Sequence, residues 1–599
     1  MRNRRIVRVE KDSLYLDQFQ LLDVSGFSIW LNPQKSGSVA FFNSCAHKGG
    51  ELTFNGQFIC SQHGWTYSSD GSNKFIGAPG LQSVNIKDET SEYIDLWLPS
   101  RPSHTLTNPP KDLVIKVLSH ACLLLEYNGF KLLIDPWLFG NAYYDSWKLY
   151  PEAKLSDFDV EADAIIITHP HPDHFHLQTL QQLKSQIPVF FPNFQSRIIE
   201  DGLNQINRIN CFEVPWRESY SFNENISFQF LQPRSLWEDS ALFICIEDTN
   251  FTFNWLNLVD AGAALWEHNL PKIDLMTSAF NQGASGYPLT WGHLDDSKKT
   301  SILNEQKRNT LELLPKRCRE LNVKYFLPFA GHWRLAQPEH RKYNEMIPQT
   351  TLDEVEQSFQ LCLSPTKVLK VSPGKEYNFK TKILSTFAPE QFQSHADEEK
   401  RELGDSNSEI DFTKFISKFE SYMNQLVEES EFFGVEFVNF TVIVDTQKYQ
   451  KTFSFVSSES STSESIQVSV TIPERLFCLL AEGKANWDHV SIGYWGLWNR
   501  SPNRYPVNFM RLLQIGKSKF NVKSVSTKSV NEDLILQKTI GDLIEINPKA
   551  VGSILNRAGL PCGACLRTNT ETLESALSLH DIDIKSASWI TRELRTIIH

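Results

Sequence analysis

The sequence predicts a multidomain α+β protein, because the chain is long and its composition changes sharply at two places. With 599 residues it is too long for one hydrophobic core, and its length corresponds to about four domains. A proline-rich stretch at 101–110 and a charged stretch poor in apolar residues at 388–410 are typical of linkers. We therefore expect domains at 1–100, 111–386, 411–517 and 539–599.

The composition excludes several classes of function. The formal net charge is -12 and Lys and Arg form no long run, which argues against nucleic acid as a partner. The apolar stretches are too short to span a membrane, and the basic start lacks the apolar core of a signal peptide. The ten cysteines are not arranged as a disulfide framework, so we expect a cytoplasmic protein. A homo-oligomer is compatible with this sequence.

Two mixed cysteine–histidine pairs mark the first domain. Cys45 and His47 are spaced C-x-H, and Cys60 and His63 are spaced C-x-x-H, each pair in a glycine-containing loop. This is the ligand set of a Rieske 2Fe-2S cluster, in which two thiolates hold one iron and two imidazoles hold the other. A structural zinc site is the alternative, although zinc fingers usually group cysteine with cysteine and histidine with histidine. Short strands broken by Gly, Asn and Ser predict an all-β module around these loops.

The second domain contains both strand and helix patterns, which indicates α/β layers. We expect strands at 114–118 and 130–134 around the Asn128-Gly129 turn, which is a hairpin signal. A buried strand at 163–168 and a helix at 177–185 follow.

A histidine-rich motif comes directly after the strand that ends at residue 168. His169, His171, Asp173 and His174 have the spacing H-x-H-x-D-H, which resembles the signature of the metallo-β-lactamase fold, an αββα architecture. The resemblance implies that His169 and His171 bind one metal, and that Asp173 and His174 bind a second. Imidazoles and a carboxylate at one strand end suit first-row transition metals such as iron, zinc or manganese.

Further candidate residues lie at other predicted strand ends. We expect Asp260 and His332 to be metal ligands, and we expect His120, Asp173 and His332 to act in catalysis. Asp135 could support the metal loop. Asp260 and His332 could alternatively be turn or capping residues. A hydrolase of this fold usually has another histidine near 232–237, and this sequence has none there, which favours an oxygen-binding iron site over a two-zinc hydrolase.

The pairing of these two modules resembles the CMP-N-acetylneuraminate hydroxylase family over residues 1–517. The shared stretches include the cluster loops, the histidine motif and the segments 118–122, 134–138, 283–290, 328–331 and 487–493. The resemblance implies that a ferredoxin or cytochrome, with its reductase, delivers electrons through His47 or His63. They would pass to a metal that activates O2 and hydroxylates a small-molecule substrate. The substrate itself stays open, because the cluster loops are specific to a cofactor.

The rest of the chain carries weaker signals. The segment 411–517 resembles an α+β sterol-carrier-protein fold. The C-terminal segment 539–599 resembles a small helical domain that occurs beside hybrid-cluster proteins. There Cys562 and Cys565, spaced C-x-x-C, would form a redox pair whose thiol pKa is lowered at a helix start.

Two other classes of function remain open at this point. A zinc or manganese pair would make the chain a hydrolase, with the cluster acting as a redox sensor. A second site without metal would favour a non-enzymatic electron-transfer or scaffold protein.

Overall fold

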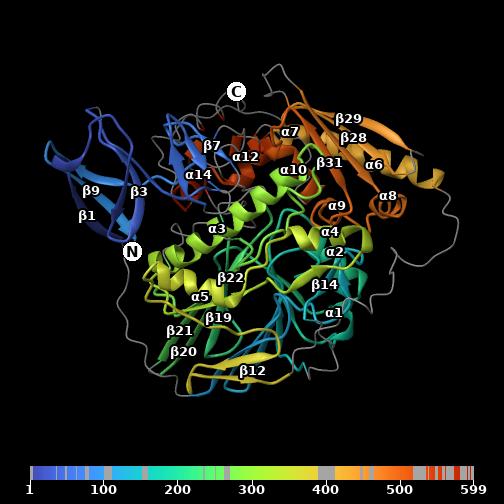
Figure 1. The fold of residues 1–599 in the computed structure, drawn as a ribbon, viewed down its shortest axis with the longest axis horizontal. Coiled ribbons are helices and arrows are strands. Elements are labelled where there is room, and N and C mark those ends of the chain that lie inside the picture. Colours follow the sequence, from blue (N-terminus) through green and yellow to red (C-terminus); the bar gives the residue numbers. More distant parts are fainter. Residues whose placement is uncertain are drawn as a thin grey trace.

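The structure is a computed structural model that describes the chain in segments (Figure 1). The predicted residues His47, His63, Cys562 and Cys565 lie outside the described residues. The described residues are 4–35, 37–46, 50–61, 64–73, 80–99, 111–151, 160–233, 237–249, 251–261, 270–388, 412–445, 449–457, 465–516, 535–536, 538–546, 551–552, 554–555, 560, 572–579, 590 and 594.

The N-terminal unit is built from short antiparallel strands, as the broken apolar pattern predicts. Its apolar core includes Phe27, Ile29, Ile94 and Leu96, which alternate with more exposed residues along their strands. Three small sheets have the strand orders β1 (Arg4–Glu10), β9 (Tyr93–Pro99), β8 (Ile86–Glu89); β2 (Gln20–Val24), β3 (Phe27–Asn32), β4 (Val39–Phe42); and β5 (Leu52–Phe54), β6 (Phe58–Cys60), β7 (Thr66–Tyr67).

The second unit contains two large mixed sheets. One has the order β17 (Cys211–Val214), β16 (Val189–Pro192), β15 (Ala164–Ile166), β12 (Phe130–Ile134), β11 (Leu123–Tyr127), β10 (Leu113–Val117), β26 (Lys375–Asn378), β27 (Ile383–Thr386). The other has the order β18 (Tyr220–Ser221), β19 (Ile226–Leu231), β20 (Ala241–Asp248), β21 (Phe251–Val259), β22 (Leu275–Ala279), β23 (Tyr325–Phe329), β25 (Lys367–Val368). One apolar cluster contains residues of both sheets, so the two sheets share a core.

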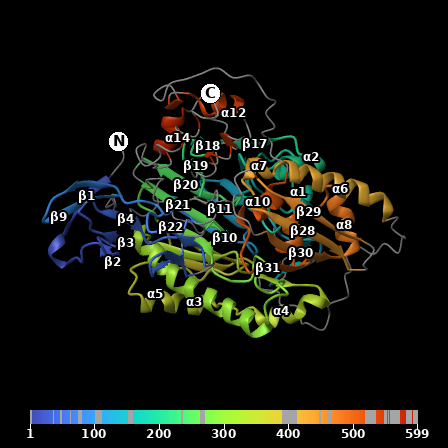
Figure 2. The same cartoon turned by 90° about the horizontal axis from the view of Figure 1, so that it is seen from above.

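Helices flank these sheets. The longest is α3 (Asp296–Glu320), and Asp295 caps its start by accepting a hydrogen bond from the backbone N–H of Lys298. It lies beside α5 (Leu352–Leu361), as both views show (Figures 1 and 2). The other helices of this unit are α1 (Leu177–Gln182), α2 (Ile198–Gln205) and α4 (Arg341–Met346).

The predicted hairpin around Asn128-Gly129 exists, but one of its strands differs from the prediction. The strand that pairs with β12 across this turn is β11, and β10 lies on the far side of β11. Residues 118–122 form the loop that connects β10 to β11. The error arose because the apolar run continues through residues 123–127, so the strand next to the turn was not separated from the strand before it.

The third unit packs helices against a four-stranded sheet. The strand order is β29 (Gln450–Phe455), β28 (Val438–Val444), β30 (Ile466–Ile472), β31 (Leu497–Ser501). The alternation of buried and exposed residues along β28 and β30 places one face of the sheet in the core. The helices are α6 (Thr413–Glu428), α7 (Ser430–Phe433), α8 (Glu474–Ala481), α9 (Trp487–Ser491) and α10 (Val507–Ile515). The unit is thus α+β, and its likeness to a sterol carrier stays a prediction.

The C-terminal segment is described in short pieces. They include α12 (Ile540–Ile546) and α14 (Leu573–Leu579), which share an apolar cluster. None of the helices within the described residues has both the length and the apolar character needed to cross a bilayer.

Helix α10 connects the third unit to both of the others. Val507, at its start, belongs to the apolar cluster that contains Cys45 and Cys60 of the first unit. Arg511 and Gln514, further along the same helix, contact Gln195 and His171 of the second unit. Helix α3 also touches the first unit, because Asn309 Nδ2 donates a hydrogen bond to the Ser61 carbonyl at 3.2 Å.

Candidate cluster loops and metal centre

Cys45 and Cys60, the two cysteines predicted to hold a cluster, are buried in one small core. Cys45 follows β4. Its backbone N–H donates a hydrogen bond to the Gly50 carbonyl at 2.8 Å, and this bond closes the first loop. Cys60 ends β6, and its N–H bonds the Trp65 carbonyl at 2.7 Å to close the second loop. Neither cysteine forms a disulfide.

Tyr67 of strand β7 joins the two loops. Its hydroxyl oxygen lies 2.9 Å from Cys45 Sγ and accepts a hydrogen bond from the Ala46 N–H at 3.2 Å. The pKa of Tyr67 is raised well above its usual value. Burial is the largest cause, and the nearby sulfurs of Cys45 and Cys60 add to it. The phenol therefore stays protonated and can donate its O–H to sulfur. A hydrogen bond to a ligand sulfur is one of the ways in which a protein tunes the potential of an iron–sulfur cluster.

The first half of the metal centre contains two imidazoles and one carboxylate. His169, His171 and Asp239 offer ligand atoms that lie within 4.8 Å of one another. Asp239 lies just before β20, close in sequence to the region where we expected a histidine and found none. The Ser240 hydroxyl donates to the Thr168 carbonyl at 2.6 Å, and this bond fixes the Asp239 segment against the histidine loop. A carboxylate, with the two imidazoles, therefore completes a group of three possible ligands.

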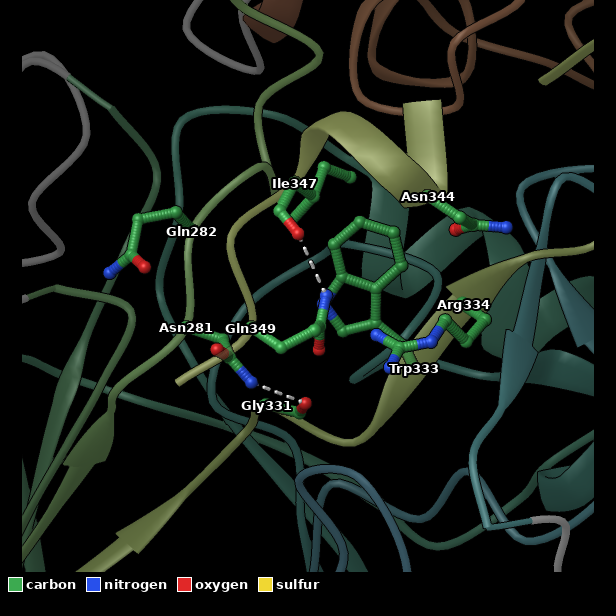
Figure 3. A pocket seen from close by; sticks show the side chains of 8 residues that line it. All are labelled: Asn281, Gln282, Gly331, Trp333, Arg334, Asn344, Ile347 and Gln349. Carbon is green, nitrogen blue, oxygen red and sulfur yellow. Dashed lines mark hydrogen bonds between the residues drawn. The ribbon is translucent and has the colours of Figure 1, made fainter. Parts of the chain in front are cut away.

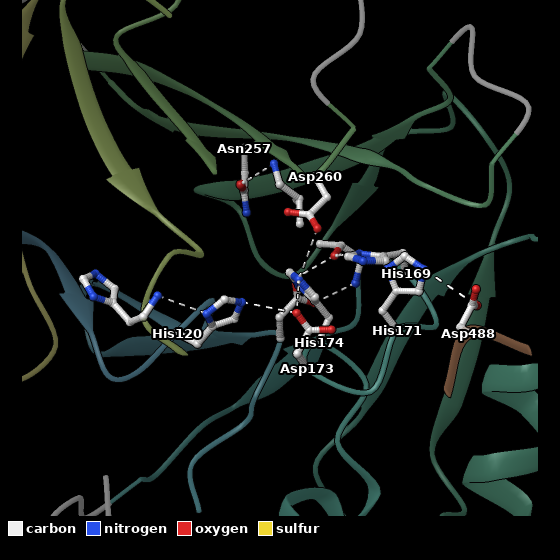
Figure 4. Close-up of polar contacts among 12 residues, drawn as sticks. His120, His169, His171, Asp173, His174, Asn257, Asp260 and Asp488 are labelled. Carbon is white, nitrogen blue, oxygen red and sulfur yellow. Dashed lines mark hydrogen bonds and ion pairs between the residues drawn. The ribbon is translucent and has the colours of Figure 1, made fainter. Parts of the chain in front are cut away.

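The second half repeats this chemistry. His120, Asp173 and His174 also offer ligand atoms within 4.8 Å of one another. Asp173 Oδ2 lies 3.2 Å from His120 Nε2 and 3.4 Å from His174 Nε2 (Figure 4). The Tyr143 hydroxyl donates to the other carboxylate oxygen, Oδ1, at 2.6 Å. Burial opposes the charge on Asp173, but His174 and His120 lower its pKa well below the usual value.

Asp135, at the end of β12, orients the histidines of the motif. Its fully buried carboxylate accepts hydrogen bonds from Thr168 N at 2.8 Å and Thr168 Oγ1 at 2.6 Å, and it lies 2.9 Å from His174 Nδ1. With Nδ1 bonded to Asp135, the Nε2 atom of His174 is left for a metal. This is the usual arrangement in which a carboxylate supports a metal-binding histidine.

Asp260 lies next to the second group. Its Oδ2 atom is 4.0 Å from His174 Nε2. The strand pairing shifts by one residue between Asn257 and Val259, and Val259 has a φ of 52°. Such a bulge changes the direction of the following side chain, and here it brings Asp260 to the centre (Figure 4).

His332 contacts the centre through its backbone. Its N–H donates to His120 Nδ1 at 3.2 Å, so it orients the His120 ring. The His332 ring packs against Phe280 and is not part of the described groups whose ligand atoms converge. Burial, and then His120, lowers the pKa of His332 to about 3, so this ring is neutral. The structure thus gives His332 an orienting contact, where the sequence predicted a ligand.

The donor set fits a metal. Asp239 Oδ2 and His174 Nε2 are buried and form no hydrogen bond with any described residue. A buried carboxylate oxygen without a donor costs about 1–3 kcal/mol or more, and a bound cation removes this cost. Each half also contains two imidazoles and one carboxylate, the combination typical of non-haem iron sites with open positions.

A small polar pocket lies beside this centre. Residues 331 and 333, on either side of His332, both line it. Arg334 contributes a guanidinium that lies 4.8 Å from the centre of the Tyr150 ring. Amide side chains supply most of the remaining polar groups (Figure 3). The lining residues are Asn281, Gln282, Gly331, Trp333, Arg334, Asn344, Ile347 and Gln349.

Comparison with protein families agrees with this geometry. Residues 5–86 match the family model of the Rieske 2Fe-2S domain, and residues 114–235 match that of a beta-lactamase superfamily domain. The chain has a Rieske domain and a β-lactamase-fold domain. The Rieske domain holds the cluster that the spacing of Cys45, His47, Cys60 and His63 predicted. The lactamase-like domain contains the convergent histidines and aspartates.

Curated relatives are similar to about half of this chain. The cytidine monophosphate-N-acetylneuraminic acid hydroxylase of Danio rerio is 25% identical over 361 residues, which cover 55% of this chain and 60% of that protein. The hydroxylase of Pan troglodytes is 27% identical over 340 residues, covering 53% of this chain and 57% of that protein. The match therefore spans less than two thirds of the length of these relatives. Among solved structures, CmlA, a diiron beta-hydroxylase from Streptomyces venezuelae, is 14% identical with a TM-score of 0.30, covering 45% of this chain and 54% of that one.

Sequence reasoning did not identify three residues of the centre. Asp239 lacks a motif of its own, and only the absence of a histidine nearby could have directed attention to it. Tyr143 and Asp488 reach the histidine motif from a loop and from the third unit. Their proximity depends on how distant segments pack, which local spacing does not encode.

Proposed function

We propose that this chain is a Rieske-type oxygenase that hydroxylates a small polar molecule. One observation carries the proposal: a Rieske domain shares the chain with a buried centre in which His169, His171 and Asp239 meet. Two histidines and one carboxylate suit iron that binds oxygen, whereas a two-zinc hydrolase would use an additional histidine. Iron bound there would activate O2 with electrons from the cluster.

The residues of the second half would hold or orient a second metal. Asp173 and His174 would be its ligands, joined by His120 and by Asp260. Tyr143 and Asp135 would fix Asp173 and His174 through the hydrogen bonds described above. His332 would orient His120 through its backbone N–H, and its role as a ligand stays a prediction.

The cluster and the metal centre are linked within one chain. Val507 lies in the core of the cluster loops, and Gln514 Nε2 lies 3.4 Å from His171 Nε2. These two residues are seven positions apart in α10, which corresponds to a rise of about 10 Å. The rise measures only the helical segment between these two residues, and the contacts at its two ends support electron transfer from the first domain to the second within one chain.

The substrate and the redox partners belong to the same proposal. The named relatives act on a nucleotide-linked sugar acid, and the amide-rich pocket with Arg334 would accept an anionic, hydrogen-bonding molecule. We infer that the substrate is an amide, an amine or a nucleotide-linked metabolite. A ferredoxin or cytochrome with its reductase would supply electrons in the cytoplasm.

The remaining expectations stay predictions. They are the domain limits 1–100, 111–386, 411–517 and 539–599, the sterol-carrier likeness of the third unit, and a redox role for Cys562 and Cys565.

Metal analysis of anaerobically purified protein tests the proposal. We expect iron in excess of the two cluster atoms in each chain. His169→Ala should remove iron from the centre and leave the visible and EPR spectra of the cluster unchanged. Stoichiometric zinc would instead indicate the hydrolase, and the absence of any further metal would indicate an electron-transfer protein.

A further inference from the structure

The third unit places polar side chains against His171 of the metal centre. Asp488 Oδ2 lies 3.7 Å from His171 Nε2, and the Gln514 amide nitrogen lies 3.4 Å from the same atom. Figure 4 shows Asp488 on the opposite side of His171 from Asp173, His174 and Asp260. The Nε2 edge of this imidazole therefore faces the third unit, and the other ring nitrogen, Nδ1, is left for a metal.

Asp488 is a buried carboxylate, and burying its negative charge is costly unless a positive or hydrogen-bonding group lies beside it. Its side chain is 8% exposed, and its Oδ2 atom forms no hydrogen bond with any described residue. His171 Nε2 lies 3.7 Å from this oxygen, and the Gln514 amide donates a hydrogen bond to the same carboxylate group. A small movement would turn the 3.7 Å contact into a charge-assisted hydrogen bond, and the Oδ2 atom would then no longer be unsatisfied.

The backbone around Asp488 is held firmly. Asn486 caps α9 by accepting hydrogen bonds from Asp488 N at 3.1 Å and His489 N at 3.3 Å. The indole N–H of Trp495 donates to the Tyr143 carbonyl at 2.8 Å, and the indole N–H of Trp147 donates to the Ile492 carbonyl at 3.1 Å. These bonds tie the segment of Asp488 to the loop that also supplies Tyr143 to the centre.

We infer that Asp488 is a positioning residue of the metal centre, contributed by the third unit. Its carboxylate accepts the N–H of His171 Nε2, which fixes the tautomer of His171 and directs Nδ1 at the metal. The centre is then complete only when the third unit is docked, and metal binding and docking favour each other. The inference rests on the proposed metal centre.

The test compares two variants that each remove one carboxylate from the third unit. Asp488→Asn replaces the carboxylate next to His171 by a neutral amide, and the control Glu436→Gln makes the same change at a residue whose described contacts are with α10. Binding of Fe2+ and of Co2+ to the cluster-loaded chain is measured by competition with a chelator. The visible spectrum of the Co2+ form is recorded, and hydrogen exchange in α9 and α10 is followed with and without metal.

We expect Asp488→Asn to weaken metal binding about 10- to 100-fold and to change the Co2+ spectrum, whereas Glu436→Gln changes neither. Metal should slow exchange in α9 and α10 of the wild type but not of Asp488→Asn, and Asp488→Glu should partly restore affinity. Wild-type affinity in Asp488→Asn, or an equal loss in Glu436→Gln, would overturn the inference. A wild-type chain that binds neither metal would overturn the proposed function as well, since no ligand would then need positioning.

Discussion

The cluster loops and the metal centre are built in opposite ways. The two described cluster cysteines lie fifteen positions apart in neighbouring loops, and Tyr67, which contacts Cys45, follows soon after. The proposed ligands of the metal centre come from segments around residues 120, 170, 239 and 260, and the proposed positioning residue Asp488 comes from the third unit. A local site can be recognised from spacing alone, whereas a convergent site needs the whole fold.

The largest effect is expected from removing Asp239, a proposed ligand that was identified from the fold and not from the sequence. We expect Asp239→Ala to lower metal affinity at least 100-fold, because the first group then keeps only two of its three ligands. Iron analysis of the cluster-loaded protein measures the loss. The exposed Glu247, also on the β20 side of the lactamase-like domain, provides the control Glu247→Gln. Full iron content in Asp239→Ala would show that Asp239 is not a ligand.

The region between the two sites offers a pH test. Glu436 lies close to the backbone N–H groups of Asn508 and Phe509 at the start of α10. Burial, although opposed by these N–H groups, raises the pKa of Glu436 to about 7. The folded protein therefore favours the protonated acid. This contribution is complete below the unfolded pKa of about 4.5 and is lost as the pH rises through about 7.

Chemical denaturation across this pH range checks the prediction. Relative to Glu436→Gln, the wild type should lose about 1–3 kcal/mol of unfolding free energy between pH 4.5 and 7. Parallel pH curves for the two proteins would mean that Glu436 ionises normally.

The smallest effect is expected at the cluster loops, where Tyr67 contacts Cys45. Tyr67→Phe removes one hydrogen bond to the Cys45 sulfur, worth about 1 kcal/mol, so the reduction potential of the cluster should fall by roughly 40 mV. Protein-film voltammetry or a redox titration followed by EPR measures the shift. Tyr93→Phe, a change on the distant strand β9, is the control. An unchanged potential in Tyr67→Phe would show that the phenol does not donate to the sulfur.

The sequence predicted the residues that depend on local spacing and missed those that depend on packing. The cysteines of the cluster loops, the histidine motif after β15 and the hairpin turn at Asn128-Gly129 were all predictable from spacing or turn chemistry. Asp239 was missed because a single aspartate before a strand has no signature. His332 was predicted as a ligand because it follows a strand, and its ligand role stays a prediction, since the structure shows a backbone contact with His120 and the ring is not among the described groups of converging ligand atoms.

The central claim is that electrons from the cluster are used at the metal centre of the same chain. Stopped-flow absorption of the chemically reduced protein, mixed with O2, follows reoxidation of the cluster directly. We predict that reoxidation is at least about 10-fold slower in metal-depleted His169→Ala than in the iron-loaded wild type, with the same cluster spectrum in both. Equal rates with and without metal at the centre would contradict the account.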